Sequence, residues 1–126
     1  MIVGTVNDKL EPRIPLLVES SGGNQRQVDA LVDTGFTGML SLPQETVDQL
    51  QLMPDANGAA LLADEQWHEC SAFWGFVVWH GQSLFKRIHS LGAEVFVGTE
   101  FLSGTAMAAE FRPGGKVTLE KLVVQQ

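Results

Sequence analysis

One carboxylate of this chain occupies a setting that favours chemistry: Asp33, which stands immediately before Thr34 and Gly35. The apolar residues Ala30 to Val32 predict a buried strand that delivers this aspartate to a turn. A carboxylate at such a place is costly unless hydrogen bonds or a catalytic role compensate for it. Gly35 and Gly38 have no Cβ, so backbone N–H groups can approach the carboxylate closely. Taken alone, Asp, Thr and Gly also suit an ordinary turn at the end of a strand.

The segment from Asp33 to Phe36 resembles the active-site loop of clan AA aspartic peptidases, and more narrowly their single-lobe, retropepsin-like branch. The segment from Leu40 to Pro43 stands where that branch has an apolar strand ending in Leu-Pro. The segment from Val95 to Gly98 is similar to the element that crosses behind the catalytic loop in the family. Thr99 to Leu102 is similar to the short helix that follows there, and Glu110 to Leu119 to the family's closing hairpin.

The resemblance implies an all-β fold, a retropepsin-like acid-protease lobe built as a closed β-barrel with a flap hairpin and one or two short helices. It also implies an aspartic endopeptidase that hydrolyses a peptide or protein substrate. Aspartic proteases are the standard case in which two carboxyl groups share one proton and supply both a base and an acid.

This chain carries a single Asp-Thr-Gly and no Asp-Ser-Gly. The second carboxylate must then come from another copy, which predicts a homodimer with Asp33 facing Asp33 across a two-fold axis. The resemblance gives Thr34 the role of a hydrogen-bonding link between the two loops. It gives Gly35 the role of bringing its backbone N–H to the carboxylate.

Two other functions remain open, because a fold does not guarantee an activity. The same lobe could bind peptides in its groove without efficient catalysis. It could also be a monomeric interaction domain, in which Asp33 would be unpaired and inert.

A polar segment near the middle of the chain is predicted to be the tip of the flap. Strands are expected from Ala59 to Leu62 and from Trp67 to Phe73, on either side of this tip. The tip residues Ala63, Asp64 and Glu65 are the candidates for substrate binding. Two carboxylates there could select a basic substrate side chain, although they also suit a solvated turn.

Strands and hairpins dominate the remaining pattern. Strands from Ile14 to Ser20 and from Gln27 to Val32 flank a glycine-rich turn, and the even-numbered residues of the second strand share one face. A further hairpin is expected from Phe76 to Trp79 and Ser83 to His89. Pro43 precedes a predicted helix from Gln44 to Leu50. Apolar strands at the two ends, Met1 to Val6 and Val117 to Val124, are the expected dimer contacts because unpaired edge strands seek partners.

Composition limits the function classes. The 126 residues give room for a single domain, residues 1–126, with one core. The net charge of −7 argues against nucleic acid or an anionic membrane as the main partner. No apolar run reaches the ~20 residues that span a bilayer, and the first residues do not resemble a signal peptide. The single cysteine, Cys70, and three histidines without ligand spacing predict no metal, no cofactor and a reducing, cytoplasmic compartment.

Overall fold

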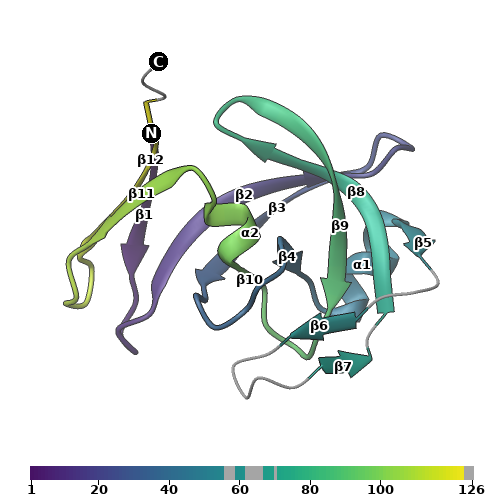
Figure 1. The fold of residues 1–126 in the computed structure, drawn as a ribbon, viewed down its shortest axis with the longest axis horizontal. Helices are drawn as coiled ribbons and strands as arrows, with labels where there is room; N and C mark the ends of the chain where they lie inside the picture. Colours follow the sequence, from purple (N-terminus) through teal and green to yellow (C-terminus); the bar gives the residue numbers. More distant parts are fainter. Residues whose placement is uncertain (56–58, 62–66, 70, 124–126) are drawn as a thin grey trace.

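The computed structural model describes residues 1–55, 59–61, 67–69 and 71–123 (Figure 1). Strands prevail among these residues, and two short helices accompany them, which confirms the predicted all-β class. In chain order the elements are β1 (Ile2–Val6), β2 (Pro12–Glu19), β3 (Gln25–Val32), β4 (Leu40–Ser41), α1 (Gln44–Leu50), β5 (Met53–Asp55), β6 (Ala59–Leu61), β7 (Trp67–Glu69), β8 (Ser71–Trp79), β9 (Gln82–Ser90), β10 (Phe96–Val97), α2 (Thr99–Leu102), β11 (Thr105–Ala109) and β12 (Lys116–Lys121).

Six of the strands close into a β-barrel, as predicted. Each strand of the barrel is hydrogen-bonded to the next in the order β2, β3, β10, β4, β9, β8. The pairing of β8 with β2 completes the ring. The strand β3 shows the expected alternation, because Val28, Ala30 and Val32 are buried while Asp29 is exposed. The barrel interior is apolar, and its burial supplies the main driving force for folding. Fully buried residues of this core include Ile14, Val18, Leu40, Val77, Ile88 and Val97.

Most local elements match their predicted positions, but the bounds of the strand expected from Trp67 to Phe73 are wrong: β7 ends at Glu69, and β8, which pairs with β9, begins at Ser71. The helix α1 spans Gln44–Leu50, after Pro43, and buries Val47 and Leu50. β8 and β9 pair with Trp79 opposite Gln82, which leaves a two-residue turn. β6 and β7 pair as the arms of a hairpin, as expected for the strands around the predicted flap tip. The tip candidates Ala63, Asp64 and Glu65 lie outside the described residues.

The two ends of the chain pair with each other, and the prediction that they are unpaired edge strands is wrong. β1 lies between β12 and β2, with Ile2 opposite Leu119 and Val3 opposite Thr118. β12 lies between β1 and β11, so β11 is the outer strand at this end of the sheet. The hairpin from β11 to β12 returns the chain beside β1, and each terminal strand finds its partner within the chain. Figure 1 shows β1 and β12 side by side.

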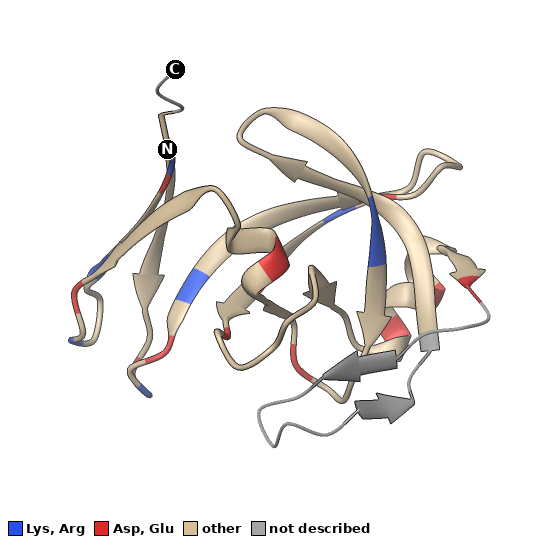
Figure 2. Cartoon of the chain, in the orientation of Figure 1, with Lys and Arg blue, Asp and Glu red and all other residues tan. Residues whose placement is uncertain are grey.

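Charge is distributed without a concentrated basic region. Figure 2 shows the few Lys and Arg residues separated over different strands and turns, with acidic residues between them. In the part of the chain that the structure describes, neither helix is long and apolar enough to cross a membrane.

Candidate active site

The loop that carries Asp33 runs from β3 to β4, and β10 lies between these two strands. β10 is parallel to β3, with Val97 opposite Val32, and antiparallel to β4. The N–H of Asp33 donates to the carbonyl of Val97 at 2.9 Å, and the N–H of Gly98 donates to the carbonyl of Met39 at 3.2 Å. The short strand β10 therefore holds both ends of the loop.

The Asp33 carboxylate organises its own turn. Its Oδ1 accepts a hydrogen bond from the N–H of Gly35 at 2.9 Å, and its backbone carbonyl accepts one from the N–H of Phe36 at 3.2 Å. A side-chain oxygen bonded to the N–H two residues later is typical of an Asx turn. Asp33 is half-buried, and Thr34 beside it is exposed. The carboxylate is thus fixed by backbone contacts at the outer end of a barrel strand.

Phe36, to which sequence reasoning gave no role, supports this loop from inside. Its side chain is only 1% exposed. The ring packs edge-on against Phe96, with centroids 5.0 Å apart, and against His89 at 5.8 Å. Edge-to-face aromatic pairs contribute roughly 0.5–1.5 kcal/mol beyond their buried area. An aromatic residue directly after Asp-Thr-Gly was the signal that could have identified this anchor.

Two glycines leave the space that Phe36 occupies. A Cβ at Gly38 would overlap the Phe36 ring, and a Cβ at Gly98 would overlap the carbonyl oxygens of Phe36 and Gly38. Thr99 adds a hydrogen bond from its N–H to the Phe36 carbonyl at 2.8 Å. The segment after β10 therefore crosses directly behind the loop, and only glycine permits this approach of backbone to backbone.

An ion-pair cluster on the outside of the barrel joins the elements around the loop. Arg13 of β2 donates from Nε to Asp29 of β3 at 2.6 Å and from Nη2 to Glu94 at 2.8 Å. Glu94 lies two residues before β10, so the cluster connects β2, β3 and the approach to β10. Burial opposes the charge on Arg13, but its hydrogen bonds to Glu94 and Asp29 outweigh this and raise its pKa.

The chemistry of this arrangement is that of a single positioned carboxylate. Such a group can accept a proton from water, but peptide hydrolysis also needs an acid that protonates the carbonyl oxygen or the leaving amine. Among the described residues, no three His, Cys, Asp or Glu side chains gather in a way that could hold a metal ion. Cys70 lies outside the described residues.

Comparison with protein-family models, curated proteins and solved structures gave no match to this chain. The functional assignment therefore depends on the resemblance in the sequence and on the geometry of the Asp33 loop.

Proposed function

We propose that the chain is a retropepsin-like aspartic peptidase, active as a homodimer in which two Asp33 carboxylates face each other. The observation that carries the proposal is the Asp33 turn: a half-buried carboxylate bonded to the N–H of Gly35 and held behind by β10. An ordinary surface turn has no need of a strand inserted between its two arms. It also has no need of glycines at the two positions that contact Phe36.

The exposure of the loop supports a partner across it. Thr34 is exposed at the outer end of the loop, where its hydroxyl is available to a second copy. Asp33 is half-buried and close by, so a symmetric contact through Thr34 would bring the two carboxylates together. The acid that one lobe lacks would then be the Asp33 of the other lobe.

The reaction follows from the shared proton. Two unit charges about 4 Å apart repel by on the order of 4 kcal/mol at an effective dielectric of 20, so one carboxylate of the pair holds a proton. The ionised Asp33 takes a proton from water, and the oxygen of that water attacks the peptide carbonyl. The protonated Asp33 donates its proton to the carbonyl oxygen. The tetrahedral intermediate then expels the amine, which receives a proton from the dyad.

A peptide-library cleavage assay at mildly acidic pH tests this proposal. We expect the wild-type chain to cleave peptides and Asp33→Asn to lose at least a hundredfold in rate, because the amide cannot act as a base. Asp8→Asn is the matched control, since Asp8 is exposed in the turn between β1 and β2. Full activity in Asp33→Asn would overturn the proposal. Peptide binding without cleavage by the wild type would also overturn it, in favour of a binding domain.

A further inference from the structure

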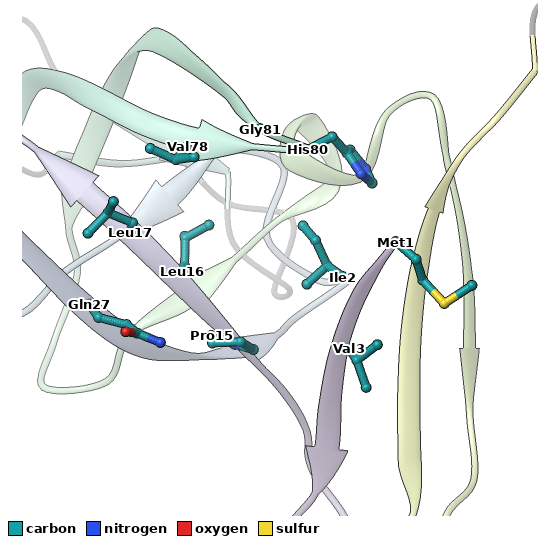
Figure 3. A pocket seen from close by; sticks show the side chains of 10 residues that line it. All are labelled: Met1, Ile2, Val3, Pro15, Leu16, Leu17, Gln27, Val78, His80 and Gly81. Atoms are coloured by element: carbon teal, nitrogen blue, oxygen red, sulfur yellow. The ribbon is translucent and has the colours of Figure 1, made fainter.

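A hollow lies away from Asp33, between the start of β1 and the turn that joins β8 to β9 (Figure 3). Its volume is about 570 Å³, within the range of roughly 300–1,000 Å³ that small-ligand sites occupy. Gln27 of β3 lines it, six residues before Asp33 on the same strand. At ~3.3 Å per residue this places the hollow about 20 Å from the Asp33 loop.

The hollow exists because two strands diverge. β1 pairs with β2 only through Thr5 opposite Arg13 and Val6 opposite Pro12. Further along the same edge of β2, the strand pairs with β8, and this pairing begins at Leu17. Between these contacts β1 and β2 separate, and the space is walled by apolar side chains. Figure 3 shows Ile2 and Leu16 extending into this space from opposite sides. Leu17 and Val78 also line it.

His80 reaches toward the hollow from the β8–β9 turn. Its φ is 48°, in the left-handed region that a two-residue hairpin turn requires and that histidine enters more readily than most residues. Its Nε2 is shielded from solvent and has no hydrogen-bond partner among the described residues. A shielded polar atom without a partner is unfavourable, and a ligand that formed a hydrogen bond with it would remove this cost.

Two positive charges, those of the N-terminal amine and Lys121, act on His80, and the acidic residue Glu120 is exposed directly before Lys121 on β12. Leu119 of β12 is opposite Ile2, and Lys121, two residues later, lies on the same face of β12 as Leu119. Burial, followed by the positive charges of the N-terminal amine and Lys121, lowers the pKa of His80. Among the described residues that line the hollow, none is acidic. In a chain with a net charge of −7, this apolar space with a cationic rim favours an anionic ligand with an apolar body.

We infer that the hollow binds an amphiphilic monocarboxylate of the medium-chain fatty acid type. Its tail would lie against Ile2, Leu16 and Val78. Its carboxylate would accept hydrogen bonds from His80 Nε2, after a rotation of the imidazole ring, and from Lys121 Nζ. This site is independent of the proposed peptidase activity, and neither depends on the other.

Titration with decanoate, followed by amide chemical shifts and calorimetry, tests the site, and decanol serves as the uncharged ligand of equal length. We expect decanoate to shift the amides of Ile2, Leu17 and His80. His80→Asn keeps a residue that tolerates positive φ, and it should weaken decanoate binding at least tenfold while leaving decanol binding unchanged.

Lys121→Gln should weaken decanoate binding in the same direction, whereas Lys9→Gln, at an exposed turn, is the matched charge control and should not. Val78→Phe should reduce the binding of both ligands because it fills the hollow. Any of three results would overturn the inference. Wild type and His80→Asn could bind decanoate with equal affinity, the decanoate-induced amide shifts could be confined to other parts of the chain, or the wild type could fail to bind decanoate. None of these results bears on cleavage, because His80→Asn leaves the Asp33 loop intact.

Discussion

Gly98 is the residue at which one added methyl group would perturb the Asp33 loop most directly. A Cβ there meets the carbonyl oxygens of Phe36 and Gly38, which are backbone atoms of the loop itself. We therefore expect Gly98→Ala to lower the free energy of unfolding by about 1–3 kcal/mol, the usual cost of overpacking. Gly22→Ala is the control, since a Cβ at Gly22 would only make ordinary contact with Ser20. Urea denaturation of both variants measures the difference, and equal stability would show that the loop does not depend on this approach.

His80 gives the stability of the chain a pH dependence of known sign. Burial, the N-terminal amine and Lys121 lower its pKa in the folded state, below its usual value near 6.5. Between these two pKa values the unfolded chain binds more protons, so this contribution to stability is present at neutral pH and is lost as pH falls. We expect wild type to lose more stability than His80→Asn between pH 7.5 and 5. The two remaining histidines are common to both proteins and cancel in the comparison. If the free energy of unfolding changes with pH in the same way in wild type and His80→Asn, the environment assigned to His80 is wrong.

At the residue scale, the sequence indicated Asp33 and its glycine but not Phe36. A carboxylate before Thr-Gly at the end of an apolar strand is a local pattern, and the bond from the Gly35 N–H to Asp33 is a local contact. The role of Phe36 depends on Phe96 and His89, which reach it only after the barrel has closed. Contacts between residues so far apart in the sequence do not produce a periodic pattern of residue types, so the sequence alone does not predict them.

At the scale of elements, the Arg13 cluster is the clearest test of how β2, β3 and β10 are held together. The Arg13 side chain is 15% exposed, whereas those of Asp29 and Glu94 are 68% and 55% exposed, so solvent screens both pairs. We expect Arg13→Gln to lower the free energy of unfolding by about 1 kcal/mol, and less at high salt. Arg112→Gln is the matched control because Arg112 is largely exposed and lies 3.8 Å from Glu110.

Hydrogen exchange locates the effect of the Arg13 cluster. In Arg13→Gln, the amides of Leu31 and Asp33 should exchange faster, because they donate to the carbonyls of Val95 and Val97, close to Glu94. The amides of β8, which do not contact the cluster, should keep their protection. Uniform acceleration over the whole barrel would show that the cluster stabilises the fold in general and not the approach of β10.

The same scale shows which elements a sequence can predict. The helix α1 and the β8–β9 turn were predicted because a proline before the helix and a glycine in the turn are local signals. The resemblance to a family element predicted that the segment from Val95 to Gly98 crosses behind the Asp33 loop, but the pairing of β10 with both β3 and β4 was not predicted. The pairing of β1 with β12 was missed, because it joins the two ends of the chain and nothing in either strand specifies the other.

At the scale of the whole molecule, the proposed dimer should respond to pH. Two ionised carboxylates in contact repel by on the order of 4 kcal/mol, so a dimer that joins two Asp33 side chains retains a shared proton. In separate chains the two carboxylates do not face each other, so this repulsion is absent. The dimer then binds more protons than two monomers do. By linkage it is favoured at lower pH and weakens as the pH rises.

Sedimentation of wild type and Asp33→Asn between about pH 4 and 8, a range set by the ordinary titration of carboxylates, measures this dependence. Wild type should dissociate more readily toward neutral pH. Asp33→Asn carries no charge at this position, so its dimer should show a flatter profile and be at least as tight at neutral pH. Asp8→Asn removes one acidic charge from the exposed turn between β1 and β2 and should follow wild type. Should Asp33→Asn and wild type dissociate with the same pH dependence, the two Asp33 carboxylates do not face each other, and the catalytic acid must be sought elsewhere.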